Sequence, residues 1–194
     1  MNLCQRILKR LMDLAGSAVG LVLASPLMLY IALRIRLESR GPAIFRQERA
    51  GRDMKPLTLY KFRTMRVDAD PFGVSPTGGD DPRLTRFGRR LRETSRDELP
   101  QLWNVLRGDM SLVGPRPLYL SQAREFTDRQ RRRLEVKPGL TGMAQVSGRG
   151  DLPHAEKLEL DVQYVENVSL GLDLKIIWRT VVLVFRRQHV YQRW

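Results

Sequence analysis

Twenty consecutive residues near the N-terminus, Leu14–Leu33, carry no charged side chain. An apolar helix of this length can cross the hydrocarbon core of a bilayer. Pro26 stands near its centre, where it removes one helix hydrogen bond and favours a kink. The hydroxyl of the neighbouring Ser25 can bind the backbone carbonyl that such a kink frees. The segment therefore predicts a kinked membrane helix.

Basic residues stand at both ends of this segment: Arg6, Lys9 and Arg10 before it, and Arg34, Arg36 and Arg40 after it. Basic residues that flank a membrane segment favour the cytoplasmic side, so a straight span would carry one cluster across. Folded at Pro26, each half of about ten residues reaches ~15 Å, or one leaflet. We therefore predict a re-entrant helix within residues 1–40. A Pro-kinked transmembrane helix is the alternative.

Residues 41–194 predict one cytoplasmic domain, continuous with the membrane helix and without a repeat or an internal boundary. The fold class expected is mainly helical with short strands, in a monotopic protein that lies on the membrane. The pattern predicts the following elements: strands at 44–45 and 56–65, a loop over 68–82, helices over 84–93, 99–107, 121–135 and 154–166, a rigid turn in "SLVGPRP", and a long loop over 137–150.

The last predicted helix, about 173–187, carries an apolar stripe: Leu174, Ile177, Trp178, Val181, Val182 and Phe185. The spacing is that of one helix face, and the stripe is too short to span a bilayer. A helix of this kind is suited to lying in the membrane interface. A helix whose stripe faces the protein core is an equal alternative.

The net charge of +13 comes from 34 basic residues, of which only six are Lys, against 21 acidic ones. Arg is suited to bidentate contacts with phosphate, so the excess points to an anionic partner or to a solvated basic face. Charge alone leaves nucleic acid, anionic membrane lipids and phosphorylated substrates open. Cys4 is the only cysteine, which excludes an internal disulfide and a zinc site built from thiolates.

The stretch "RETSRDELPQLWNVLRGD" contains the candidate catalytic residues. Pro100 fits only the first turn of a helix, so the helix begins just before it. Asp97 and Glu98 then lie at the helix start, where backbone N–H groups favour anions. Arg92 and Arg96 flank them and can neutralise a bound diphosphate. Adjacent carboxylates point about 100° apart on a helix, which predicts separate roles for them. A capping box between Ser95 and Glu98 is the structural alternative.

Several long motifs indicate a family to which the chain is similar. They are Ser25-Pro26, "YKFRTM", "DPRLTRFGRRLRETSRDELPQLWNVLRGDMSLVGPRP" and "KPGLTGMAQVSGRG". With them the chain resembles the bacterial sugar transferase family, small monotopic phosphoglycosyl transferases that start glycan assembly on a lipid carrier. The resemblance covers nearly the whole chain, which looks like the minimal catalytic unit. Arg96 and Glu93 depart from the residues usual in the family beside the acidic pair.

The resemblance implies a two-step reaction. Asp97 would attack the β-phosphate of a UDP-sugar and release UMP, and undecaprenyl phosphate would then take the phosphosugar from Asp97. Glu98 would assist with Mg²⁺ or with protons, so the two carboxylates are also the expected metal ligands. Five basic residues would lie near phosphate or nucleotide: Arg92, Arg116, Arg149, Lys61 and Arg63.

The resemblance also places the protein on the cytoplasmic face of the bacterial inner membrane, in contact with anionic lipids. A homo-oligomer is compatible with the sequence. Two other functions compete with this one: an inactive membrane-bound scaffold and a nucleic-acid-binding protein. An intact Asp97–Glu98 pair argues against the first. Against the second stand the membrane segment and the lack of a known docking motif or of aromatic residues interleaved with basic ones.

Overall fold

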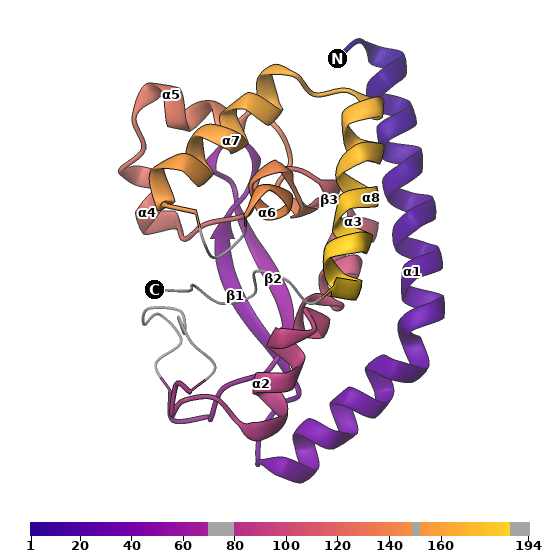
Figure 1. Ribbon diagram of the computed structural model, residues 1–194, viewed down its shortest axis with the longest axis vertical. Helices are drawn as coiled ribbons and strands as arrows, with labels where there is room; N and C mark the ends of the chain where they lie inside the picture. The colour runs from indigo at the N-terminus through magenta and orange to yellow at the C-terminus, as the bar shows by residue number, and fades with distance from the viewer. Residues whose placement is uncertain (70–79, 149–151, 187–194) are drawn as a thin grey trace.

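The computed structural model describes residues 1–69, 80–148 and 152–186 (Figure 1). The fold is mainly helical with short strands, as predicted. Its elements, in chain order, are α1 (Leu3–Glu38), β1 (Ile44–Ala50), η1 (Arg52–Met54), β2 (Pro56–Phe62), α2 (Arg86–Glu93), η2 (Arg96–Glu98), α3 (Gln101–Arg107), β3 (Ser111–Val113), α4 (Leu120–Arg124), α5 (Asp128–Arg131), η3 (Arg132–Leu134), β4 (Gly139–Thr141), α6 (Met143–Ser147), α7 (His154–Glu166) and α8 (Leu170–Arg186).

Helix α1 passes through Pro26 without a break. Because Pro26 has no N–H, the carbonyl of Val22 loses its usual partner, and the Ser25 hydroxyl donates to that carbonyl at 2.8 Å. The prediction for Ser25 is confirmed. The expected fold-back is not seen: α1 bends in its second half but stays one helix of 36 residues (Figure 1). Helix α1 is long and apolar enough to cross a membrane.

One face of α1 packs on the rest of the protein along most of its length. A Cβ at Gly16 would lie 2.7 Å from Leu112, and one at Gly20 would lie 3.2 Å from Leu102, so the backbone approaches the domain closely there. Ile31 and Ile35 are buried further along. The opposite face is exposed and apolar, and its large side chains are Leu3, Ile7, Leu8, Leu11, Val19, Val22, Leu23, Leu29, Tyr30, Leu33 and Leu37.

Polar contacts tie both ends of α1 to the domain. Near the start, Lys9 Nζ donates to Asp173 Oδ2 of α8 at 2.6 Å and to the carbonyl of Val113 at 3.1 Å. At the far end, Arg63 donates to the carbonyl of Ser39, at 2.8 Å, and to that of Arg40. The two ends of the apolar segment are thus held by the same folded unit.

The predicted strands form an antiparallel hairpin. Its register runs from Ile44 opposite Phe62 to Ala50 opposite Pro56, with η1 in the turn. Alternation along β2 places Lys61 on the same face as the buried residues Leu57 and Leu59, because side chains two apart share a face. This alternation directs Lys61 toward the acidic pair.

Two predictions about irregular segments are wrong, because their glycines allow close backbone approach. "SLVGPRP" contains β3, which pairs in parallel with β4 through Ser111–Gly139 and Val113–Thr141. The expected loop over 137–150 therefore holds a strand, and helix α6 follows it. A Cβ at Gly139 would lie 2.1 Å from the backbone nitrogen of Gly114, so a larger residue would push the strands apart.

The predicted helix over 121–135 is also wrong, because three short helices replace it. Phe126 turns inward and is only 6% exposed. Thr127 then caps α5, with its side chain accepting from the Gln130 backbone. A new capping box inside a charged run ends one helix and starts the next.

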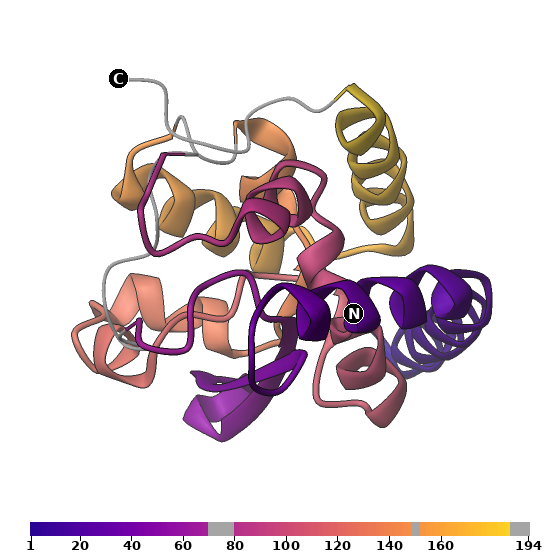
Figure 2. The same cartoon turned by 90° about the horizontal axis from the view of Figure 1, so that it is seen from below.

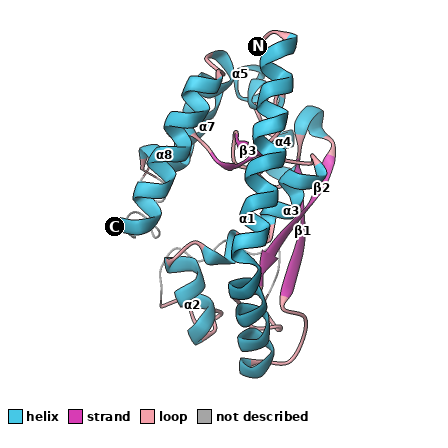
Figure 3. Ribbon diagram, turned by 90° about the vertical axis from the view of Figure 1, so that its right-hand side faces the viewer, coloured by secondary structure: helices cyan, strands magenta, loops and turns pink. Residues whose placement is uncertain are grey.

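Helix α8 has two apolar sides. Ile176 is 2% exposed and packs in the core, whereas Leu174, Trp178 and Val181 of the predicted stripe are exposed. Figures 1 and 2 both place α8 and α1 on the same side of the molecule, and Figure 3 shows that side face on. Ile177 of the same stripe packs against the buried cluster around Ile176, so the stripe lies partly on the surface and partly against the core. The side chain of Phe185 lies outside the described residues.

Replacing Gly88 of α2 by Ala is expected to destabilise the protein strongly. An added Cβ would lie 2.0 Å from the Thr64 carbonyl oxygen, which is backbone and moves only with β2 and its neighbours. We expect a loss of about 3 kcal/mol, seen as a melting temperature about 6–12 °C lower in detergent. Gly171→Ala is the matched control, since nothing lies within 4 Å of its Cβ. That variant should melt at the same temperature or slightly higher; equal melting of both variants would contradict the prediction.

Candidate active site

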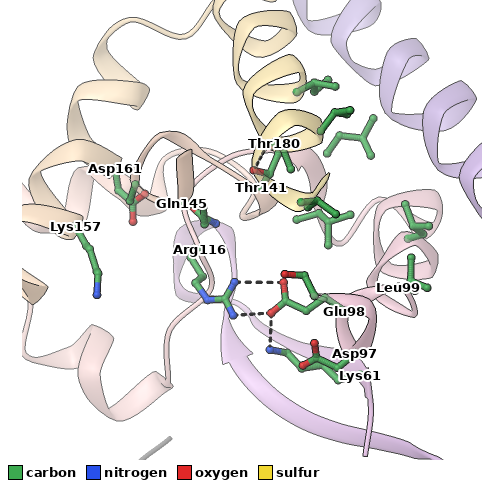
Figure 4. Close-up of a pocket in the computed structure, with 18 of the residues that line it drawn as sticks. Lys61, Asp97, Glu98, Leu99, Arg116, Thr141, Gln145, Lys157, Asp161 and Thr180 are labelled. Atoms are coloured by element: carbon green, nitrogen blue, oxygen red, sulfur yellow. Dashed lines mark hydrogen bonds and ion pairs between the residues drawn. The ribbon is translucent and has the colours of Figure 1, made fainter. Parts of the chain in front are cut away.

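A cavity of about 700 Å³ lies beside the acidic pair (Figure 4). Its polar end holds Asp97, Glu98, Lys61, Arg92 and Arg116. The lining also includes large apolar side chains, and those beside α1 and on α8 form its apolar end; the full set is Leu99, Leu102, Leu112, Leu118, Leu140, Ile177, Val181 and Val184. Gly16 places α1 at this apolar end, and α8 supplies the last three side chains. The cavity thus joins a charged region to the apolar side of the molecule.

The acidic pair lies in the short helix η2, one turn before α3. Ser95 precedes it in the left-handed conformation, with φ 55°, and its side chain makes no capping hydrogen bond. The capping box between Ser95 and Glu98, which was the structural alternative for this stretch, therefore does not form. Leu99 and Pro100 continue with helical backbone angles into α3, so Pro100 stands at the first turn as predicted. The Glu98 side chain is left to point into the cavity.

Glu98 is held by two cations. Lys61 Nζ donates to its Oε1 at 3.0 Å, and Arg116 donates to Oε1 at 2.6 Å and to Oε2 at 3.4 Å (Figure 4). Burial alone would favour the neutral acid, but Arg116 and Lys61 outweigh it and hold the pKa of Glu98 far below its usual range. The pKa of Arg116 is raised in turn by Glu98. Glu98 is therefore an ionised anchor for both cations.

Asp97 lies in a different environment, although it is the adjacent residue. It is 8% exposed, and the described residues give it no hydrogen bond or ion pair. Burial, helped by the charge of Glu98, raises its pKa to about 6, against the opposing effect of Lys61, Arg92 and Arg116. At neutral pH it is an ionised, poorly solvated carboxylate open to the cavity. Such a group is suited to nucleophilic attack.

The predicted basic residues fall into three groups. Lys61 and Arg116 bind Glu98, and Arg92 lines the cavity with its Nε donating to the Thr64 hydroxyl at 2.9 Å. Arg63 lies elsewhere: it is buried at the end of α1 and is not among the described residues that line the cavity, which differs from its predicted phosphate role. Arg149 lies outside the described residues. Ser25 and Pro26 lie within α1, as expected of a membrane-helix motif.

The sequence reasoning missed a second polar group in the same cavity. Arg133 of η3 donates to Asp161 Oδ2 of α7, both side chains are nearly fully buried, and Gln145 of α6 lies beside them. Burial raises the pKa of Asp161 to about 6 despite Arg133. A signal was present: Asp161 falls at helical spacing among Leu158, Val162 and Val165, where an apolar residue is expected.

Within the described residues, no cluster of three His, Cys, Asp or Glu side chains offers a metal site made by protein alone. Three described carboxylates line the cavity: Asp161 is paired with Arg133, and the other two, Asp97 and Glu98, are adjacent. Mg²⁺ commonly takes one or two carboxylates and completes its shell with substrate phosphates and water. The donor set therefore fits a Mg²⁺ that arrives with a phosphorylated substrate.

Comparison with known proteins identifies the family to which the chain belongs. The family model for bacterial sugar transferases matches residues 4–187. The uncharacterized sugar transferase EpsL of Bacillus subtilis is 48% identical over 187 residues, which cover 96% of this chain and 91% of that protein. The UDP-glucose:undecaprenyl-phosphate glucose-1-phosphate transferase of Escherichia coli is 43% identical over 194 residues. The undecaprenyl-phosphate galactose phosphotransferase of Salmonella typhimurium is 41% identical over 201 residues.

In the latter two cases the match covers 96% of this chain but only 42% of the relative, so the chain spans less than half of those longer proteins. The match with EpsL runs nearly end to end on both sides. A family model that covers almost the whole chain, together with relatives above 40% identity, decides the classification. The chain belongs to the bacterial sugar transferase family.

Proposed function

We propose that this protein transfers a phosphosugar from a UDP-sugar to undecaprenyl phosphate and releases UMP. Support comes from the activities for which the Escherichia coli and Salmonella relatives are named. The observation that carries the proposal is the asymmetry of the acidic pair: Glu98 is neutralised by two cations, whereas Asp97 faces the cavity as a carboxylate without a described partner.

In the first step a carboxylate oxygen of Asp97 attacks the β-phosphorus of the UDP-sugar. A P–O bond forms to Asp97, and the bond between that phosphorus and the bridging oxygen breaks, so UMP leaves with the bridging electrons. In the second step an oxygen of undecaprenyl phosphate attacks the same phosphorus and Asp97 is released as a carboxylate. No proton has to move onto the nucleophile, because Asp97 is ionised above pH 6.

The cations beside Glu98 supply charge for both steps. Arg116 and Lys61 stand against the acidic pair, and Arg92 lines the same cavity. Fixed donors of this kind stabilise negative charge that develops on phosphoryl oxygens during transfer. Glu98 acts by positioning these donors, which keeps them from pairing with Asp97. The two adjacent carboxylates therefore have different roles: Asp97 attacks phosphorus, and Glu98 holds the cations.

The apolar end of the cavity suits the lipid substrate. Side chains of α3 and α8, together with Gly16 of α1, line it on the same side as the exposed apolar faces of those helices. A polyprenyl chain can thus leave the cavity into lipid while its phosphate reaches the basic end. Both substrates are anionic, so an Arg-rich site between cytosol and membrane brings them together.

Mg²⁺ is part of the proposal. Asp97 and Glu98 are the residues that would hold it, together with the substrate diphosphate. When bound, the ion supplies positive charge that offsets the charge of the diphosphate and of the departing UMP. The protein residues still perform the attack and hold the phosphates in place.

We place the protein on the cytoplasmic face of the bacterial inner membrane, with α1 entering and leaving on the same side. Support comes from the contacts at both ends of α1: Lys9 with Asp173, and Arg63 with Ser39 and Arg40. A span across ~30 Å of hydrocarbon would put one of these contacts on the far side. The exposed apolar face of α1 can remain in lipid while its other face holds the domain.

A labelling experiment tests this topology. Cys4 is exposed and serves as the probe for the first end, and Arg40→Cys in a Cys4→Ser background probes the second. A membrane-impermeant maleimide should label both positions in inverted membrane vesicles and neither in intact spheroplasts. Labelling from opposite sides would establish a spanning helix and overturn the re-entrant topology.

The activity is tested by UMP release from UDP-glucose and UDP-galactose with Mg²⁺. Without undecaprenyl phosphate we expect a burst of at most one UMP per protein molecule. With the lipid we expect continued turnover. If neither nucleotide sugar nor any other UDP-sugar in a panel releases UMP, the scaffold function is favoured. Salt-sensitive binding to duplex DNA at physiological ionic strength would favour the nucleic-acid function instead.

A further inference from the structure

The cavity has a third region, opposite the acidic pair, which we call the Gln145 wall. It consists of Gln145 of α6 and Asp161 of α7, both labelled in Figure 4, together with Arg133 of η3. Asp161 and Arg133 are each 2% exposed. Figure 4 shows Gln145 and Asp161 across Arg116 from Glu98 and Asp97. The wall is part of the same cavity but has no role in the steps described above.

The Gln145 wall holds polar atoms that the protein leaves unpaired. Oδ1 of Asp161, Nε of Arg133 and both amide atoms of Gln145 are buried without a hydrogen-bond partner among the described residues. Buried polar groups in folded proteins are nearly always paired, so a set of four in one cavity needs a partner from outside the chain. The partner must offer both donors and acceptors, because the unpaired atoms include both kinds.

The pairing of the wall indicates what kind of ligand fits. Asp161 and Arg133 form an ion pair, so these two side chains add no net charge of their own, and the cation beside them in the cavity is Lys157 of α7 (Figure 4). Hydroxyl groups match it, since each hydroxyl can donate to Asp161 or to the Gln145 oxygen and accept from the Gln145 amide or from Arg133. A nucleobase would favour an aromatic stacking partner, and the described lining of the cavity contains no Phe, Tyr or Trp.

We propose that the Gln145 wall binds the hydroxyl groups of the transferred sugar and so determines which UDP-sugar the enzyme accepts. This inference rests on the proposed function. The phosphorus that Asp97 attacks carries the sugar directly, and Arg116 connects the two regions: its guanidinium binds Glu98, while its carbonyl accepts from Arg133 at 2.7 Å. A phosphate held by Arg116 therefore leaves its sugar beside the wall, and the apolar end stays free for the lipid.

The decisive variant is Gln145→Met, which keeps the length of the side chain and removes both hydrogen-bonding atoms. With UDP-glucose and UDP-galactose as substrates, the KM of the better one should rise about tenfold. The inhibition constant of UMP, which lacks the sugar, should stay within twofold. The melting temperature should hold or rise, because the removed atoms have no described partner in the free protein. Gln163→Met on α7, away from the cavity lining, is the matched control and should change none of these.

Asp161→Asn gives a second test of selectivity. It keeps the shape of the side chain but exchanges an acceptor for a donor, so the ratio of kcat/KM for UDP-glucose over UDP-galactose should change at least about fivefold. Its melting temperature is measured first, since Arg133 loses its buried counter-charge. If this variant does not fold, Gln145→Met decides alone.

The outcomes separate the inference from the proposed function. Equal weakening of UMP and UDP-sugar by Gln145→Met would assign the wall to the nucleoside and overturn the inference. Unchanged kinetics in a variant that folds would overturn it as well. In both cases the wild type still turns over, so the proposed function stands. A wild type that neither binds nor converts any UDP-sugar would overturn both.

Discussion

Asp97→Asn is expected to abolish both the UMP burst and turnover, by at least about 10⁴-fold. The amide has no charge and cannot form the bond to phosphorus that the first step requires. A stopped-assay measurement of UMP with and without undecaprenyl phosphate checks both steps. The phosphosugar should also remain attached to wild-type protein when the lipid is left out, and intact-protein mass spectrometry should detect no adduct on the variant.

The same variant should be more stable than the wild type, which separates lost chemistry from lost folding. Burial raises the pKa of Asp97 from 3.8 to about 6, so its ionisation at pH 7 costs folding free energy of the order of 3 kcal/mol. Because the folded-state pKa lies above the unfolded one, the wild type gains stability as pH falls from about 6 to about 4. The advantage of the Asn variant should therefore shrink to nothing over that range.

Asp128→Asn, an exposed residue of α5, is the matched control for both measurements. It should keep full activity and the wild-type melting curve. Turnover in Asp97→Asn above the level that deamidation explains would contradict the assignment of the nucleophile. A lower melting temperature at pH 7 would contradict the argument from burial.

Glu98→Gln is expected to lower kcat/KM by about 10²- to 10³-fold and to shift the pH profile. The amide keeps the shape but loses the charge that holds Arg116 and Lys61, and these cations then pair with Asp97 instead. The charge of Glu98 also contributes to the raised pKa of Asp97, after burial. Its removal should therefore move the acid limb of kcat/KM from near pH 6 to lower pH.

The control for this variant is Glu93→Gln, which lies nearby on α2 but is exposed and outside the cavity lining. Its pH profile should match the wild type. A Glu98→Gln enzyme that is slow but keeps its acid limb near pH 6 would show that Glu98 does not set the protonation of Asp97. Full activity would remove Glu98 from the mechanism.

Local signals in the sequence sufficed for much of the fold and for the centre of the site. The apolar segment with Pro26, the hairpin and the helix over 154–166 follow from periodicity and from the residues that punctuate it. The acidic pair was found because Pro100 fixes where its helix begins, and Lys61 and Arg116 were found through family motifs. These features depend on residues that are close together in the sequence, and sequence patterns are informative over such short separations.

Contacts between distant segments were not predictable in the same way. The parallel pairing of β3 with β4 depends on Gly114 and Gly139 meeting across the fold. Arg63 has the same charge as the other basic motif residues, so its charge alone could not distinguish it from a phosphate ligand. Only the position of α1 shows that Arg63 binds the backbone carbonyls at the C-terminal end of that helix. Asp161 could have been suspected as a charged residue on an apolar stripe, but its partner Arg133 lies 28 residues earlier in the chain.

The contact between Lys9 and Asp173 has a consequence for biosynthesis, because 164 residues separate the two. At translation rates of about 5–20 residues per second, α1 emerges from the ribosome roughly 8–30 s before α8 does. During that interval the ammonium of Lys9 lacks its counter-charge, although Leu112 and Leu102, which pack against Gly16 and Gly20, are made before α8. The nascent chain can therefore complete the docking of α1 only after α8 has been made.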